Sequence, residues 1–328
     1  MRVTDVDELV TLARAGRPRA VARLISLIEN AVSDRDGTPG GVLRRAMAGL
    51  AGPGQGRPTT AWVIGLTGSP GVGKSTSTAT LVTELRRRGD RVAVLAIDPS
   101  SPFTGGALLG DRVRMQDHAT DPGVFIRSMA SRGHLGGLSW ATPHALHVLD
   151  AAGFDVILVE TVGVGQAEVD IAGLADTTVV LVAPGMGDGV QAAKAGILEI
   201  ADVFVVNKAD RDGAQATIRE LRNMVALGHA TWRPPIVPTV ALRGEGAAEL
   251  VAALDKHHAY LAESGELSRR RITRARHEIE AIALATLRSR LTDVRGRSEL
   301  DALAAAVLDG ATDPYTAADD LLATLPWP

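Results

Sequence analysis

The sequence has no cysteine among its 328 residues, and only 3% of its residues are aromatic. Without cysteine there can be no disulfide bond, no cysteine-ligated zinc, no iron–sulfur cluster and no thiol nucleophile. With so few aromatic side chains, a nucleic-acid surface built on base stacking is not expected. The 35 basic and 38 acidic residues give a net charge of −3, so no overall basic field would attract nucleic acid or an anionic membrane.

Long hydrophobic runs are missing as well. The longest apolar stretches, such as residues 179–183, fall far short of the roughly 18 residues that a membrane helix needs. The first ten residues, MRVTDVDELV, are acidic and lack a basic segment followed by an apolar one, so no signal peptide is expected. The composition, 45% apolar and 22% charged, is that of a folded protein. We therefore expect a cytoplasmic protein that binds neither membranes nor nucleic acid.

Between residues 62 and 240, short apolar runs rich in β-branched residues alternate with helical segments. The runs do not alternate between apolar and polar residues, as expected for strands that are buried on both faces of a parallel sheet. Seven such strands separated by helices predict an α/β domain of about 200 residues with a doubly wound, mostly parallel sheet. The strands are expected at residues 63–66, 92–97, 124–126, 156–159, 178–182, 203–206 and 236–240.

Helical segments flank this region on both sides. Apolar residues at three- and four-residue steps predict helices within residues 4–50. Residues 51–60 are rich in glycine and proline and are interpreted as a linker. Further helices are expected at 272–291, 300–308 and 317–325. The chain is therefore divided into an N-terminal helical extension with its linker (1–58), an α/β domain (59–262) and a C-terminal helical region (263–328).

A phosphate-binding loop is predicted where the first expected strand meets a helix. The octet GSPGVGKS fits G-x-x-x-x-G-K-S in the strand–loop–helix context that this motif needs. Its glycines allow backbone N–H groups to surround phosphate oxygens at a helix N-terminus. Lys74 would reach the β and γ phosphates, and the Ser75 hydroxyl would ligate Mg²⁺. The predicted phosphate-site residues are Gly68, Ser69, Pro70, Gly71, Val72, Gly73, Lys74, Ser75 and Thr76.

A base-recognition motif follows the strand expected at 203–206. Asn207, Lys208 and Asp210 fit N-K-x-D. The Asp210 carboxylate can accept hydrogen bonds from N1–H and the 2-amino group of guanine, whereas adenine presents an acceptor at N1. A site built around a hydrogen bond rejects analogues that lack it. The two motifs together predict GTP rather than ATP as the nucleotide.

Further acidic residues follow other expected strands. Glu160 begins E-T-V-G where a GTPase carries D-x-x-G, a motif that holds magnesium through water, and Gly163 would offer its backbone N–H to the γ-phosphate. Asp98 closes the second strand and is placed to join the magnesium shell. Asp111 is either part of a switch that reaches the nucleotide or a helix cap. The candidate metal ligands are Ser75, Asp98, Asp111 and Glu160.

Five segments carry a resemblance to a known family: GSPGVGKST, DPSSPFTGGALLGDRVRM, ETVGVGQAEVD, PGMGDGVQAAKAG and NKAD. Together they resemble the MeaB/ArgK group of P-loop GTPases, whose human member is the methylmalonic aciduria type A protein. The match in motifs runs from about residue 60 to residue 245. Glutamate at the start of ETVGVGQ and the D-P-S-S segment separate this group from Ras-like and elongation-factor GTPases.

The resemblance implies a magnesium-dependent GTPase that hydrolyses GTP to GDP and phosphate, slowly without a partner. It implies a chaperone that gates the loading of adenosylcobalamin and protects methylmalonyl-CoA mutase, or a related mutase for isobutyryl- or ethylmalonyl-CoA. It also implies a homodimer held by a C-terminal helical arm. The mobile elements of the family correspond to residues 103–115, 162–168 and 184–194.

The resemblance suggests further candidates for the site. Gln166 lies three residues after Gly163, and it either orients the attacking water or has a structural role. Lys194 either approaches the phosphates or lies on a helix surface. Where related GTPases hold guanine with a Ser-Ala-x loop, this chain has valine, alanine and leucine at 240–242. Because that contact is mostly made by the backbone, Ala241, Leu242 and Arg243 are retained as base-site candidates.

Two other functions fit the sequence less well than the mutase chaperone. A nickel or cobalt metallochaperone GTPase would need cysteine or histidine clusters, but the chain has no cysteine and only 8 scattered histidines. A scaffold that binds nucleotide without hydrolysing it is disfavoured by the intact candidates Lys74, Ser75, Asp98 and Glu160.

Several charged or polar residues outside the motifs have simpler interpretations. His144 and His147 could share one helix face as metal ligands do, but without a third ligand nearby a packing or surface role is favoured. His257 and His258 are expected to be solvated. The run 269–271, three arginines, could contact an acidic partner but is interpreted as a solvated helix face.

Overall fold

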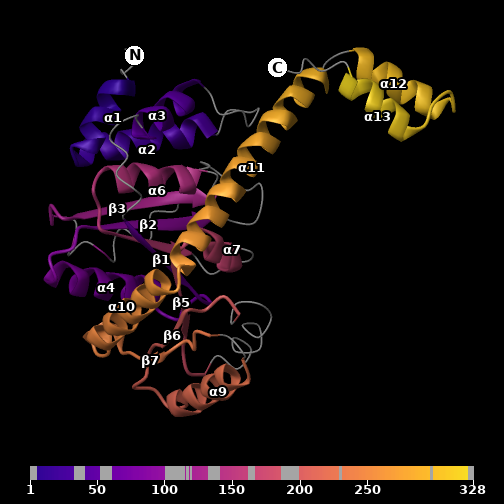
Figure 1. Ribbon diagram of the computed structural model, residues 1–328. Coiled ribbons are helices and arrows are strands. Elements are labelled where there is room, and N and C mark those ends of the chain that lie inside the picture. Colours follow the sequence, from indigo (N-terminus) through magenta and orange to yellow (C-terminus); the bar gives the residue numbers. More distant parts are fainter. Residues whose placement is uncertain are drawn as a thin grey trace.

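The computed structural model describes residues 6–32, 41–51, 61–99, 115, 118, 120–131, 141–161, 167–185, 199–228, 231–295 and 298–323. A seven-stranded sheet lies at the centre of the molecule (Figure 1). Its strands are β1 (Trp62–Thr67), β2 (Val92–Pro99), β3 (Val124–Ser131), β4 (Val156–Thr161), β5 (Thr177–Val182), β6 (Val203–Val206) and β7 (Ile236–Pro238). The order is β3-β2-β4-β1-β5-β6-β7, and every neighbouring pair is parallel. The predicted α/β fold is confirmed.

Helices cover both faces of the sheet and extend beyond it. The described helices are α1 (Val6–Arg14), α2 (Pro18–Val32), α3 (Gly41–Ala51), α4 (Lys74–Arg87), α6 (Ala141–Ala151), α7 (Ala167–Leu174), α9 (Ala214–Leu227), α10 (Ala247–Glu263), α11 (Glu266–Arg295), α12 (Ser298–Leu308) and α13 (Pro314–Ala323), with a short 3₁₀ helix η2 at Ala241–Arg243. Helices α1 to α3 form a layer outside α6, at the top of Figure 1. Among the described helices, none is both long and apolar enough to cross a membrane.

Strand β4 shows why the strands are continuously apolar. Ile157 and Val159 enter the core on the side of α6 and the N-terminal helices, whereas Val156 and Leu158 enter the core formed with α4 and α10. Burial on both faces therefore replaces the alternation of apolar and polar residues that a half-exposed strand would show. In a parallel sheet, the loops that follow the strands emerge at one edge, and ligands bind beside those carboxyl ends.

Strand β3 is longer than expected, since it pairs with β2 from Val124 to Ser131 rather than ending at residue 126. The extension contains Arg127, which is unusual in an apolar core. Its guanidinium donates hydrogen bonds to the Ala22 carbonyl and to Ser26 Oγ of α2, both at 3.0 Å. The N-terminal helices thus provide polar partners that let a charged residue continue this edge strand.

Helix α11 begins on the body and extends away from it, carrying α12 and α13 at its far end (Figure 1). Its first turns are anchored by arginines. Arg270 donates to both carboxylate oxygens of Asp202, at 2.7 and 2.9 Å, and Arg271 donates to Asp176 at 2.8 Å. Both aspartates are buried and directly precede β5 and β6, so they lie at the amino-terminal edge of the sheet. We call these contacts the arm anchor.

The arm anchor corrects two expectations from the sequence. Of the run 269–271, only Arg269 is exposed, so the prediction of a solvated face is wrong for Arg270 and Arg271. His257 is fully buried, with Nδ1 2.9 Å from Thr177 Oγ1 and Nε2 3.2 Å from Asp202. His258 stacks on the Trp62 ring with centroids 4.5 Å apart. Buried carboxylates need compensating partners, and these arginines and His257 provide them.

Candidate nucleotide site

The loop between β1 and α4 has the backbone conformation that its glycines predict. Gly68, Gly71 and Gly73 have φ angles of 143°, 80° and 95°, in the region that favours glycine. A Cβ atom on Gly68 would lie 2.3 Å from the Leu181 carbonyl oxygen, and one on Gly73 would lie 2.4 Å from Asn207 Nδ2. Larger residues at these two positions would push the loop away from β5 and from the N-K-x-D segment.

The charged end of the Lys74 side chain lies within this loop. Its Nζ donates to the carbonyl oxygens of Gly68, at 2.5 Å, and Ser69, at 3.1 Å, and its side chain is buried. Because Lys74 also begins α4, the ammonium group and the helix N-terminus point at the same space. This arrangement favours a bound anion such as a phosphate group.

The end of β4 brings a carboxylate against the first turn of α4. Ser75 Oγ donates to Glu160 Oε1 at 2.6 Å. Thr78 Oγ1 lies 2.9 Å from Glu160 Oε2 and 3.0 Å from the Lys74 carbonyl oxygen. All four side chains are buried. Thr78 was not predicted from the sequence, although it lies one helical turn after Ser75 and therefore on the same face of α4.

The oxygen atoms of this pair suit a hard divalent cation. Ser75 uses its proton to bind Glu160, which leaves the lone pairs of Oγ for a metal ion. Mg²⁺ binds through one or two carboxylates together with waters and phosphates rather than through an all-protein cage. In the described part of the chain, there is no group of three or more histidine, aspartate or glutamate side chains that could hold a metal ion.

The N-K-x-D segment is attached to the phosphate loop. Asn207 Nδ2 donates to the Val72 carbonyl at 2.8 Å, while Asn207 Oδ1 accepts from the Ala241 backbone N–H at 3.1 Å and from Thr239 Oγ1 at 3.2 Å. Lys208 Nζ donates to the Gly71 carbonyl at 2.6 Å. The backbone of Lys208 has φ 56°, a costly conformation outside glycine that marks a constrained segment.

Asp210 and the loop after β7 form the outer wall of this region. Asp210 Oδ2 accepts a hydrogen bond from Arg243 Nη1 at 3.1 Å. Ala241 is buried, and its carbonyl accepts from Thr80 Oγ1 of α4 at 2.9 Å. The Leu242 side chain is 88% exposed, so a contact from this residue to a base would come from its backbone.

The structure brings the predicted residues together in two connected groups. Lys74, Ser75 and Glu160 lie at the phosphate loop, and Asn207, Lys208, Asp210, Ala241 and Arg243 lie beside it. Asp98 is the penultimate residue of β2, at the same sheet edge, but its side chain is outside the described residues, as are Asp111, Gly163, Gln166 and Lys194. Sequence analysis missed the hydroxyls of Thr78, Thr80 and Thr239, because threonine alone carries no motif.

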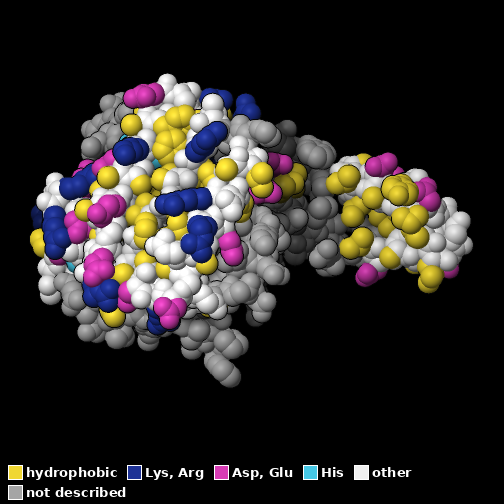
Figure 2. Space-filling model, turned by 90° about the horizontal axis from the view of Figure 1, so that it is seen from below, with side chains coloured by type: hydrophobic (Ala, Val, Ile, Leu, Met, Phe, Trp, Pro, Cys, Tyr) yellow, Lys and Arg dark blue, Asp and Glu magenta, His cyan; other side chains and the backbone are white. Residues whose placement is uncertain are grey.

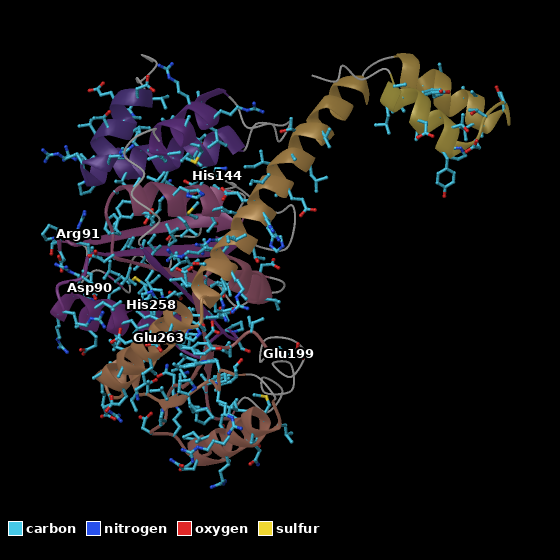
Figure 3. The ribbon with its side chains drawn as sticks, in the orientation of Figure 1. Asp90, Arg91, His144, Glu199, His258 and Glu263 are labelled. Carbon is cyan, nitrogen blue, oxygen red and sulfur yellow. The ribbon has the colours of Figure 1, made fainter. Side chains whose placement is uncertain are left out.

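A separate cavity of about 1160 Å³ lies away from this site, among α1, α3, α6 and α11. His144 of α6, labelled in Figure 3, is buried in its wall. His147 Nε2 lies 3.0 Å from Glu278 Oε2 of α11. This hydrogen bond raises the pKa of His147, and although burial alone would raise the pKa of Glu278, His147 holds it below its usual value. The pair joins α6 to the arm, which agrees with a packing role for these histidines.

The chain is similar to a family model, to curated relatives and to a solved structure. The family model described as "Methylmalonyl Co-A mutase-associated GTPase MeaB" matches residues 21–295. A putative GTPase of Pyrococcus horikoshii is 48% identical over 322 residues, covering 97% of each chain. The mitochondrial methylmalonic aciduria type A homolog of Mus musculus is 34% identical over 329 residues, covering 97% of this chain and 79% of the relative. A crystal structure titled as a LAO/AO transport system kinase superposes with a TM-score of 0.68 and 25% identity, covering 98% of this chain and 97% of that one.

Proposed function

The chain belongs to the MeaB family of P-loop GTPases, and from this premise we propose that it is a GTP-hydrolysing chaperone of an adenosylcobalamin-dependent acyl-CoA mutase. In this proposal it gates cofactor loading into methylmalonyl-CoA mutase, or a related mutase, and protects that enzyme from inactivation. The family description names the mutase, and the mouse relative is named for methylmalonic aciduria. The observation that carries the nucleotide part is the pair of hydrogen bonds from Asn207 to Val72 and Ala241, which joins the segments proposed to bind the phosphates and the base.

The described residues suggest how this site would treat GTP. Lys74 and the N–H groups at the start of α4 would bind the phosphate oxygens. Ser75 Oγ would ligate Mg²⁺, and Glu160 would orient that hydroxyl and accept hydrogen bonds from metal-bound water. When bound, Mg²⁺ neutralises charge that develops between the β and γ phosphates. Asp210 would accept from N1–H and the 2-amino group of guanine.

We expect hydrolysis by the free protein to be slow. Catalysis of phosphoryl transfer depends on positioning the attacking water and stabilising charge. The residue directly after Gly163 is valine rather than a glutamine that could orient water. Gln166 remains the candidate for that role, Lys194 is a candidate to approach the phosphates, and Asp111 is a candidate metal ligand. A mutase that positions these segments would raise the rate.

The same proposal includes a homodimer formed through helices α11 to α13, which we call the arm. Its large apolar side chains are exposed in the single chain: Leu308 by 88%, Tyr315 by 85% and Ile279 by 67%. Figure 2 shows apolar side chains gathered over the far end of the arm, at the right of the view. Exposed apolar surface of this kind is typical of protein–protein interfaces. Light scattering should detect a dimer that Leu308→Asp weakens and Leu227→Asp, at a 79% exposed position on α9, does not.

Cofactor transfer tests the chaperone function. The purified chain would be mixed with the apo-mutase of its own organism and adenosylcobalamin, and the spectrum of bound cofactor would be followed with GTP, with GDP and without nucleotide. We expect the loading rate to differ between GTP and GDP, and Lys74→Ala to abolish that difference because the phosphates are no longer held. Loading that is the same under all three conditions would contradict the gating function.

A further inference from the structure

Arg243 contacts two carboxylates. One belongs to Asp210, which is proposed to recognise guanine, and the other belongs to Glu245. Arg243 Nη1 donates to Asp210 Oδ2 at 3.1 Å. On the opposite side of the guanidinium, Nε and Nη2 donate to the two carboxylate oxygens of Glu245, at 2.7 and 3.3 Å. This is a forked contact of the kind that fixes the plane of an arginine. Glu245, Arg243 and Asp210 are therefore linked by a continuous series of hydrogen bonds.

The loop that carries Arg243 and Glu245 is closed tightly. The Val240 N–H donates to the Glu245 carbonyl at 3.0 Å, and Gly244 turns the chain with φ 71°. A Cβ atom on Gly246 would lie only 2.3 Å from the Pro238 carbonyl oxygen, so the loop presses against β7. Ala241, within the same loop, is bonded to Asn207 and to Thr80. The backbone of the loop that carries Arg243 and Glu245 is therefore held in place against β7, α4 and the N-K-x-D segment.

Arginine and guanine can bind Asp210 at the same time. A carboxylate offers about four lone-pair sites on its two oxygens. The N1–H and 2-amino groups of guanine would use one site on each oxygen, and Arg243 uses one further site on Oδ2. The Asp210 side chain is 38% exposed, and its hydrogen bond with Arg243 restricts its rotation. Ordering a side chain before a ligand arrives reduces the entropy cost of binding.

We propose that Arg243, held by Glu245, is a positioning residue that orients the Asp210 carboxylate toward guanine and thereby increases discrimination for the 2-amino group. The inference rests on the proposed role of Asp210 as the base reader. Arginine and glutamate are both charged at physiological pH, and the hydrogen bonds between them raise the pKa of Arg243 and lower the pKa of Glu245 from the usual values.

Calorimetry with GDP and inosine diphosphate tests this, because inosine lacks only the 2-amino group. The measured quantity is the ratio of the dissociation constant for inosine diphosphate to that for GDP. We expect Arg243→Ala to lower this ratio about two- to fivefold, the range for exposed ion pairs. Glu245→Ala should lower it in the same direction, and the double variant should lower it no further than Arg243→Ala. Arg243→Lys should not restore the ratio, since lysine lacks the fork that bridges both carboxylates.

Two controls separate this inference from other outcomes. Arg211→Ala, at an exposed arginine beside Asp210 in sequence, should leave the ratio unchanged. Asp210→Asn should move preference from GDP toward xanthosine diphosphate; if it does not, the base pocket itself is misassigned. If Asp210→Asn behaves as expected but Arg243→Ala weakens both nucleotides equally, the loop is only structural and the inference is wrong. Tighter GDP binding by Arg243→Ala would also overturn it, because the arginine would then compete with guanine.

Discussion

Loss of the arm anchor should lower the free energy of unfolding by an amount that can be estimated from its contacts. Replacing Arg270 by alanine removes two hydrogen bonds to Asp202, a buried carboxylate that would keep the Thr178 N–H and the contact with His257. Removing one partner of a buried ion pair costs about 3–5 kcal/mol. Because Asp202 keeps other partners and the Arg270 side chain is 31% exposed, we reduce this to about 1.5–3 kcal/mol.

Thermal unfolding measures this loss. At about 2–4 °C per kcal/mol for a large domain, Arg270→Ala should lower the melting temperature by roughly 3–12 °C. The control is Arg269→Ala. Arg269 is 69% exposed, pairs with Glu266 one turn earlier and donates to the exposed Ser264 carbonyl at 3.2 Å, so its loss should change stability by less than about 0.5 kcal/mol. Equal melting temperatures for the two variants would show that the reasoning about the anchor is wrong.

The pH dependence of the same variant gives an independent check. Burial alone would raise the pKa of Asp202, but its contacts with His257 and Arg270 hold it below its usual value. A carboxyl group with a lowered pKa stabilises the fold above its unfolded pKa, about 3.9, and loses that contribution as pH falls through the folded value. The difference between wild type and Arg270→Ala should therefore be constant from about pH 6 to 8 and shrink below about pH 4.

Three further predictions concern the nucleotide site and the arm. Asp210→Asn, which replaces an acceptor by a donor, should shift triphosphate preference from GTP toward xanthosine triphosphate, and unchanged GTP affinity in calorimetry would remove Asp210 from the base pocket. Ser75→Ala should mainly weaken the magnesium dependence of hydrolysis, so normal GTP turnover with the same magnesium requirement would contradict the assignment of Ser75. His147→Gln should lower the melting temperature most at low pH: the raised pKa of His147 means that its bond to Glu278 contributes fully below about pH 6.5 and is lost as pH rises through the folded pKa. Melting curves from pH 5.5 to 8.5 test this, and a difference that does not depend on pH would exclude it.

The fold could be predicted because its signals are local. Most strands are built on an apolar run, and burial on both faces of β4 explains why its run is continuous. The extension of β3 through Arg127 could not be foreseen, because the hydrogen bonds that accommodate this residue come from α2, about a hundred positions earlier in the chain. Such polar partners depend on tertiary packing rather than on the residue itself.

In the candidate site, too, features with a local sequence signal could be predicted, whereas features that depend on tertiary packing could not. Ser75 and Glu160 are 85 positions apart, yet both could be proposed because each follows a recognisable strand, and the structure places them 2.6 Å apart. The arm anchor was missed because Arg270 and Arg271 look like surface residues of a charged helix. The signal that could have revealed it is an aspartate placed directly before a buried strand, which occurs at both Asp176 and Asp202.

The most direct test of the central claim is GTP hydrolysis by the purified chain, measured with and without the mutase of its own organism. The account predicts slow turnover by the chain alone and a clear increase when the mutase is added. Lys74→Ala should show neither rate, because the phosphates are no longer bound. A fast basal rate that no mutase changes would contradict the partner-gated account and indicate a GTPase that acts alone.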